Sequence, residues 1–224
     1  MPCTPNRKNG GPRNSTEYQP MPSTGRLKKN TDWSLNKLRD NIDNELQDHP
    51  PYLYVVKSLV KNKDGTFGQK GCAPNFQGGL ITLCTCKHKD RAYPPKRGLK
   101  LTTWKKMWVA GICSPSAFRP RGLFYLMLVE RVYDSHADAW FGLNNPVSKS
   151  ASDNVFGDIY KPLTKTSKKW KESEYVKTIL GHKHNNRNDR LRDIQWAYNN
   201  NHNHPKLLVG KPSQSYLWSK PMII

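Results

Sequence analysis

Four apolar stretches in the middle of the chain constrain its fold more than any other feature of the sequence. Each is rich in aromatic and β-branched residues and is bounded by Gly, Pro, Ser or Asp, as β-strands and their turns are. They span residues 52–60, 80–84, 104–112 and 123–132, and two shorter candidates follow at 206–209 and 215–218. This density of strands predicts an α+β fold with a curved, mostly antiparallel sheet or small barrel and flanking helices.

Helical periodicity appears only beside this strand-rich region. Asp134 can cap a short helix through Phe141. Thr31 or Asp32 can cap a longer helix that ends near residue 46, with an apolar stripe formed by Leu35, Leu38, Ile42 and Leu46. We interpret this stripe as core packing rather than as a surface for a partner.

The N-terminal segment differs from the rest in composition. Residues 1–31 hold five prolines, six Lys or Arg residues and one acid, with almost nothing to bury. Such a composition predicts a disordered basic arm. Residues 32–224 then form a single α+β domain, which is an ordinary size for one hydrophobic core.

The chain is strongly basic, with 37 Lys or Arg residues against 17 Asp or Glu and a formal net charge of +20. A folded chain with this charge repels itself, so a polyanion is the expected partner. The alternative is a basic surface that only keeps the protein in solution.

Positive charge is concentrated in two segments that also contain aromatic residues. Residues 86–106 carry eight Lys or Arg against one acid, and residues 161–192 carry ten against three, so each has a net charge of +7. Cations that neutralise phosphates, beside rings that stack on bases, are typical of nucleic-acid binding. The rings are Tyr93, Trp104, Trp170 and Tyr175. The predicted phosphate contacts are Lys87, Arg91, Lys105, Lys168 and Lys169.

Apolar segments of the length that a membrane or a signal peptide requires are not found. No run approaches a membrane-spanning length, and the N-terminus has no apolar signal core. We therefore expect an intracellular protein, in the cytoplasm or in the nucleus of a eukaryote, with no membrane partner.

The cysteines and histidines predict neither a disulfide framework nor a metal site. Five cysteines is an odd number, which fits a reducing compartment. Cys84 and Cys86 form a CxC motif with only Cys72 nearby, whereas zinc sites usually combine paired cysteines with further ligands. The two HxH pairs, at 182–184 and 202–204, lie among Asn and Lys residues with few acids nearby. We expect no metal and no cofactor, and we interpret the second pair as part of a loop.

Motifs of known catalytic folds are missing from the sequence. There is no phosphate-binding Walker loop, dinucleotide fingerprint, HExxH or GxSxG. If the protein is an enzyme, the candidate catalytic residues are Asp158, Cys86 and Lys87. No histidine stands at a sequence spacing that predicts a contact with Cys86.

Several short motifs occur in order over about residues 52–220. They are YLYVV at 52–56, APN at 73–75 with Gly78 and Gly79, TLCTCK at 82–87 with Arg91, WVAG at 108–111, YLM at 125–127 before Val129 and Glu130, GDIY at 157–160, and LVG at 208–210 with Tyr216 and Trp218. In order and spacing this pattern resembles the nucleotide modification associated domain 2 family. The chain departs from that pattern at Lys106–Met107, where the family usually has Gly-Asp, and in lacking an Asn within GDIY.

The resemblance implies an association with systems that modify DNA bases, so DNA is favoured over RNA as the partner. The sheet pattern is also similar, at the level of fold, to readers of modified bases of the PUA, EVE and YTH type. We expect a binding module in which a pocket of the sheet domain accepts a base or nucleotide. The alternative is an enzyme that modifies or processes a nucleobase or nucleotide. The expected base-binding residues are Asn75, Thr82, Trp108, Gly111, Tyr125 and Tyr160.

Overall fold

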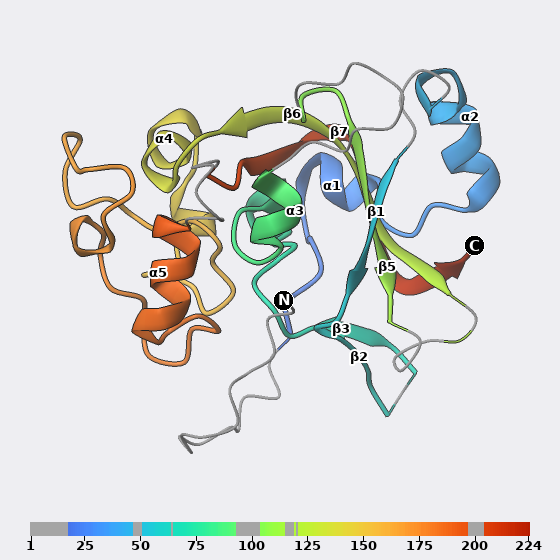
Figure 1. The fold of residues 1–224 in the computed structure, drawn as a ribbon. Helices are drawn as coiled ribbons and strands as arrows, with labels where there is room; N and C mark the ends of the chain where they lie inside the picture. The colour runs from blue at the N-terminus through green and yellow to red at the C-terminus, as the bar shows by residue number, and fades with distance from the viewer. Residues whose placement is uncertain are drawn as a thin grey trace.

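A five-stranded sheet forms the centre of the molecule, with strands in the order β1-β5-β6-β7-β4 (Figure 1). The computed structural model describes residues 18–46, 51–63, 65–92, 104–114, 119, 121–196 and 204–224. The sheet strands are β1 (Tyr52–Val56), β4 (Thr82–Leu83), β5 (Trp108–Cys113), β6 (Gly122–Tyr133) and β7 (Leu207–Ile223). A separate antiparallel ribbon joins β2 (Leu59–Lys61) to β3 (Phe67–Gln69).

The pairing confirms the predicted α+β fold with a curled, mostly antiparallel sheet. Strand β1 pairs parallel with β5, and every other pair within the sheet is antiparallel. The stretch predicted as one strand at 52–60 is divided by a turn at Lys57 and Ser58, so its second part joins the ribbon instead of the sheet.

Helices flank the sheet at both ends (Figure 1). They are α1 (Gly25–Lys29), α2 (Leu35–Leu46), α3 (His88–Ala92), α4 (His136–Gly142) and α5 (Arg187–Gln195), with short 3₁₀ turns η1 (Gln77–Gly79), η2 (Val147–Lys149) and η3 (Glu172–Glu174). Helix α2 confirms the predicted stripe in part: Leu38 and Ile42 are buried, but Leu35 is 53% exposed, and the side chain of Leu46 lies outside the described residues. Helix α4 is capped by Ser135, whose Oγ accepts from the Asp138 amide, and not by Asp134.

The two sides of the sheet are covered by different apolar clusters. Along β5 the side chains alternate, as the pleat of a strand requires. Val109 and Cys113 pack into a cluster with α1 and the β2–β3 ribbon, while Trp108 and Ala110 pack into a second cluster beneath α2. This alternation explains why every residue of β5 is buried.

The two short strands predicted near the C-terminus are one strand, β7, interrupted by a bulge. Gly210 pairs with Val129 and Ser215 with Met127, so four residues of β7 lie between positions only two apart on β6. The Asn30 side-chain amide donates to the carbonyls of Pro212, Ser213 and Ser215 and holds this bulge. The bulge keeps the strand continuous, because its carbonyls find a partner outside the ladder.

The boundary predicted for the N-terminal arm is wrong for residues 18–31. Leu27 of α1 is completely buried, and the buried Gln19 donates to the carbonyls of Gly71 and Pro74. Composition misled here because only a few buried side chains, Gln19, Leu27 and Asn30, anchor a segment that is otherwise polar. Residues 1–17 lie outside the described part of the chain.

Within the described residues, no helix has the length and apolar character needed to cross a membrane.

Candidate functional site

Two of the predicted base-binding residues, Asn75 and Thr82, belong to a buried polar network. Their backbones exchange two hydrogen bonds, of 2.9 and 2.7 Å, across an isolated bridge. The Thr82 hydroxyl donates to Asp158 Oδ1 at 3.0 Å, and the Cys84 amide donates to Asp158 Oδ2 at 3.2 Å. Asp158, a candidate catalytic residue, is therefore held by two donors of the β4 region and is fully buried.

Lys149 completes this network from η2. Its ammonium donates to Asn75 Oδ1 at 2.6 Å, to the Leu80 carbonyl at 2.6 Å and to the Asn75 carbonyl at 3.1 Å. Burial lowers the pKa of Lys149 to about 8 and raises the pKa of Asp158 to about 7, and the opposite charge of each partner limits the other's shift. We call Asn75, Thr82, Lys149 and Asp158 the lysine network.

The other predicted base-binding residues are core residues. Trp108 is fully buried in the cluster beneath α2. A side chain at Gly111 would lie 2.3 Å from the Tyr125 ring, and the Tyr125 hydroxyl donates to that of Tyr54 at 2.7 Å. The structure therefore does not gather the six residues around one pocket. Asn75 and Thr82 lie together, Gly111 and Tyr125 lie together, and Trp108 and Tyr160 lie elsewhere.

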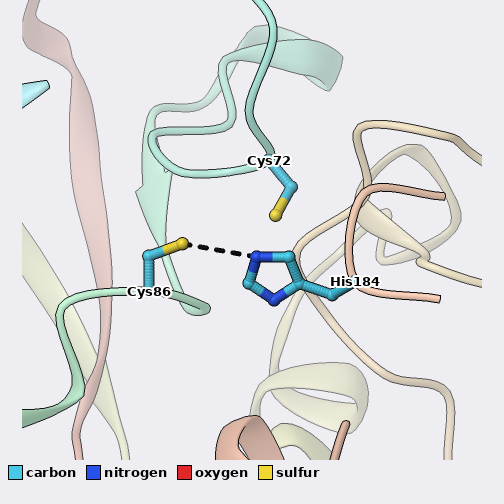
Figure 2. A group of neighbouring side chains, drawn as sticks. All are labelled: Cys72, Cys86 and His184. Atoms are coloured by element: carbon cyan, nitrogen blue, oxygen red, sulfur yellow. Dashed lines mark hydrogen bonds between the residues drawn. The ribbon is translucent and has the colours of Figure 1, made fainter. Parts of the chain in front are cut away.

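A second polar cluster forms where three separate segments meet, and Figure 2 shows its side chains. Cys72 lies in the loop after β3, Cys86 follows β4, and His184 precedes α5. Their two sulfur atoms and one ring nitrogen lie within 4.8 Å of one another, and Cys86 Sγ is 3.4 Å from His184 Nε2. These three donors could hold a metal ion. We call Cys72, Cys86 and His184 the thiol–imidazole cluster.

The backbone at Cys86, whose sulfur lies beside His184, is in an unusual conformation. Cys86 and Lys87 are consecutive non-glycine residues with positive φ, 44° and 52°. Such residues are strained and occur often at functional sites. The Arg91 Nε donates to the Cys86 carbonyl at 2.9 Å and stabilises this turn.

His184 is oriented by a buried carboxylate on α5. Asp193 Oδ2 is 2.7 Å from His184 Nδ1, and it accepts a hydrogen bond from the Tyr160 hydroxyl at 2.7 Å. The other oxygen, Oδ1, is 2.7 Å from His88 Nε2. Because Nδ1 faces an acceptor, the remaining nitrogen of His184, Nε2, faces the two thiols. Tyr160 was predicted to contact a base, but here it supports the histidine of this cluster.

His182 fixes the backbone beside His184. Its Nδ1 accepts from the His184 amide at 3.0 Å, so its Nε2 carries the proton and donates to the Gly157 carbonyl at 2.8 Å. The motif GDIY and the motif HKH are thereby joined through Gly157.

The charges in this cluster stabilise one another. A hydrogen bond with Cys86 and the nearby positive His184 lower the pKa of Cys72 well below its usual value, although burial opposes this. Burial also opposes ionisation of His184, but Cys72 and Asp193 raise its pKa well above the ordinary value. By contrast, burial and Asp158 raise the pKa of Cys84, which stays a neutral thiol. Of the two cysteines of the CxC motif, Cys86 belongs to the thiol–imidazole cluster, whereas Cys84 packs in an apolar cluster.

The predicted phosphate contacts separate into buried and exposed residues. Arg91 is buried and donates to the Cys86 and Lys206 carbonyls, so in the described conformation its guanidinium is engaged within the chain. The Lys87 ammonium lies 5.2 Å from the centre of the Tyr54 ring. Lys105 and Lys168 are exposed, and Lys169 is exposed but paired with Asp138 at 2.8 Å.

An exposed tryptophan stands among the lysines of the second basic segment. Trp170 is 42% exposed and stacks on His204, with ring centres 4.4 Å apart and planes 9° from parallel. Lys165, Lys168 and Lys171 around it in sequence are also exposed. We call Lys168, Lys169, Trp170 and Lys171 the tryptophan loop.

Sequence reasoning considered Cys72 and the 182–184 HxH pair as metal ligands and set them aside, and it gave no role to Lys149 or Asp193. Cys86 was a candidate, but its histidine stands 98 residues away, and no local pattern reports such a contact. A signal was present in the HKH motif, which is followed by the capping residue Asn186 and by Asp193 one helix later. Neither families of proteins, nor curated proteins, nor solved structures gave any match to this chain when compared with it.

Proposed function

We propose that this protein is a nucleic-acid-associated protein, linked to base modification, that contacts its nucleic acid through the tryptophan loop. The observation that carries this proposal is Trp170, an exposed indole among exposed lysines. An indole that is open to solvent and flanked by cations offers a stacking face to a base and charges to the adjacent phosphates. A stack on His204 holds the ring in place, so little side-chain entropy is lost when a base binds.

The proposal moves the base contact away from the sheet. The residues first expected to form a pocket, such as Asn75, Thr82 and Trp108, are buried, and Asn75 and Thr82 are hydrogen-bonded within the chain. A base would have to displace these contacts before it could be read there. The net charge of +20 favours a polyanion in either case.

The resemblance to the nucleotide modification associated domain 2 family is our reason for favouring DNA over RNA as the partner. The cysteines agree with a reducing compartment, since none of the four described ones forms a disulfide.

A second candidate function is an enzyme that processes a nucleobase, with Cys86 as nucleophile. One observation favours it. Cys86, His184 and Asp193 are connected in series, as a nucleophile, a base and a residue that orients the base. Asp158 and Lys87, the other candidates, do not join this series: Asp158 bonds to Thr82 and Cys84, and the Lys87 ammonium lies over the Tyr54 ring.

Fluorescence polarisation with single- and double-stranded oligonucleotides, modified and plain, tests the first function. Trp170→Ala should weaken binding by about 5- to 160-fold, since one base–aromatic stack contributes about 1–3 kcal/mol. Lys168→Gln should reduce the slope of log affinity against log salt by about 0.7–0.9. Leu53→Ala and Lys61→Gln, two exposed positions on β1 and β2, are the matched controls.

The same oligonucleotides decide between the two functions. Altered mass of the DNA after incubation, abolished by Cys86→Ala, establishes the enzyme. Unchanged mass with binding that depends on Trp170 establishes the binding module. If the wild type binds none of them at low salt, the proposed function is wrong.

A further inference from the structure

The structure assigns a new metal site: we propose that Cys72, Cys86 and His184 bind one zinc ion. This inference does not depend on nucleic-acid binding. It rests on the positions, the burial and the chemistry of the donors in the thiol–imidazole cluster.

The spacing of the donor atoms is that of a tetrahedral zinc site. Zn–S bonds of about 2.3 Å and Zn–N bonds of about 2.0–2.1 Å place a sulfur and a nitrogen about 3.6 Å apart at the tetrahedral angle. Cys86 Sγ and His184 Nε2 are 3.4 Å apart, and all three donors lie within 4.8 Å of one another. The three donors are therefore close enough to converge on one ion.

His184 presents the nitrogen that a metal requires. Its Nδ1 faces the buried Asp193 carboxylate at 2.7 Å, so Nε2 is the nitrogen directed at the two thiols (Figure 2). A histidine ligand that donates its second N–H to a carboxylate is the usual arrangement around zinc. The carboxylate is itself held by His88 and Tyr160, which fixes the plane of the imidazole.

The presence of a second thiol, Cys72, favours a metal site over a catalytic nucleophile as the interpretation of this cluster. A Cys86–His184 pair would suffice for nucleophilic catalysis, and Cys72 would then have no reason to approach the same nitrogen. Cys72 is fully buried and lies 3.1 Å from the Thr85 hydroxyl, which can donate to a thiolate. Two soft thiolates and an imidazole select zinc over magnesium or calcium, which prefer oxygen ligands.

Three protein ligands leave one coordination position for a fourth group. Sites with three protein ligands keep this position for water or substrate, whereas structural sites close it with a fourth residue. Cys86 is only partly buried, unlike Cys72 and His184, so solvent lies nearest on its side of the cluster.

The ion would connect three segments that are far apart in sequence. Cys72 precedes β4, Cys86 follows it, and His184 lies about one hundred residues later, ahead of α5. A metal bound only by the folded chain stabilises that chain. Zinc therefore fastens the loop-rich region around α5 to the end of the sheet.

The test begins with metal analysis of the full-length protein purified without added zinc and without chelators. We expect about one zinc per chain by mass spectrometry of the elements. Cobalt(II) added to the stripped protein should give thiolate-to-cobalt charge-transfer bands in the near ultraviolet and intense visible bands typical of tetrahedral coordination. Protein that holds no zinc and gives no such spectrum overturns the proposal.

Variants then locate the site. Cys72→Ser, Cys86→Ser and His184→Ala should each reduce zinc affinity at least 100-fold, whereas Cys84→Ala, in the same CxC motif, should retain it. Loss of the charge-transfer bands in Cys84→Ala alone would place the metal elsewhere. Circular dichroism shows which of these variants are folded.

A measurement on the wild type keeps the test independent of variant folding. Iodoacetamide should label Cys86 only after zinc has been removed with a chelator, and peptide mass spectrometry identifies the site. If Cys86 is labelled equally with and without zinc while Cys72 stays unlabelled, the cluster is a nucleophile and its hydrogen-bonding partners. A Cys72–Cys86 disulfide in protein purified without reductant, with zinc present throughout, would equally exclude the site, because oxidised sulfurs cannot bind the ion as thiolates.

Discussion

The lysine network and the thiol–imidazole cluster are both polar and mostly buried, and they differ in how hydrogen-bond donors are matched to acceptors. In the lysine network the ammonium of Lys149 meets three acceptors and the carboxylate of Asp158 meets two donors. In the other cluster two sulfurs and one ring nitrogen meet, and each of these atoms can bind a metal ion once it has released its proton. In the lysine network the charged groups find their hydrogen-bond partners within the chain. The thiol–imidazole cluster could instead bind a cation between its donor atoms.

This difference shows that burial of polar groups does not by itself indicate a functional site. Buried polar groups are costly unless paired, so a saturated network is expected wherever the fold must enclose them. A set of converging acceptors is different, because it repels itself until a proton or a metal ion joins it. The balance of donors and acceptors therefore distinguishes a structural network from a binding site.

Breaking the saturated network should give the largest effect. Lys149→Met removes a buried cation and leaves three acceptors and the Asp158 carboxylate without it, so we expect a loss of about 3–5 kcal/mol in the free energy of unfolding. Urea denaturation measures the loss. Lys165→Met, at an exposed lysine, should change the free energy by less than about 0.5 kcal/mol. Equal effects of the two substitutions would contradict the structural role of Lys149.

Weakening the support of His184 in the thiol–imidazole cluster should have an intermediate effect on zinc affinity. Asp193→Asn leaves all three zinc ligands in place but weakens the hold on His184 Nδ1, so zinc affinity should fall about 10- to 100-fold. Competition with a chromogenic chelator measures the affinity. Asp189→Asn, on the first turn of the same helix, is the control. Unchanged affinity in Asp193→Asn would mean that the carboxylate does not orient the ligand.

Removing one hydrogen bond from this support should have a smaller effect. Tyr160→Phe deletes the donor to Asp193 Oδ2 while keeping the ring, and the resulting change in zinc affinity should be about 5-fold or less. The same competition experiment measures it. A loss larger than that of Asp193→Asn would require Tyr160 to act on the metal directly.

The contribution of Asp158 to the free energy of unfolding should depend on pH. Burial raises the pKa of Asp158 from 3.8 to about 7, so the folded chain binds this proton more tightly than the unfolded chain. Stability from this group is therefore complete below about pH 4 and is lost as the pH rises through 7. Unfolding free energies from urea titrations, wild type minus Asp158→Asn, should fall over that interval. A difference that rises with pH would show that the carboxylate is stabilised in its ionised form.

The parts of the fold that follow local patterns could be predicted from the sequence. Helix α2 and the cores of β4, β5 and β6 were found because apolar periodicity reports which face is buried. The continuity of β7 was missed, since its middle residues, Lys211 to Gln214, look like a turn. Only Asn30, far away in the sequence, makes the bulge favourable.

The candidate sites were harder to predict for a related reason. Lys149 stands in a Ser-rich polar stretch and looks like a surface lysine, yet it is completely buried. The approach of Cys86 to His184 is decided by how the segment before α5 folds back onto the end of β4. The identity of a residue does not reveal such partners, whereas the exposed tryptophan loop was already visible as a basic segment with aromatic residues.

The position of β7 has a consequence for how the protein is made. Residues 207–223 lie between β6 and β4 in the sheet, and Leu217 also accepts the Asp32 amide from near the start of the described chain. A ribosome delivers β4 and β6 long before it delivers their shared neighbour. Until then β4 lacks its only strand partner, and one edge of β6 is open to other chains. An aggregation-prone edge of β6 is therefore exposed during translation until β7 has emerged and paired with it.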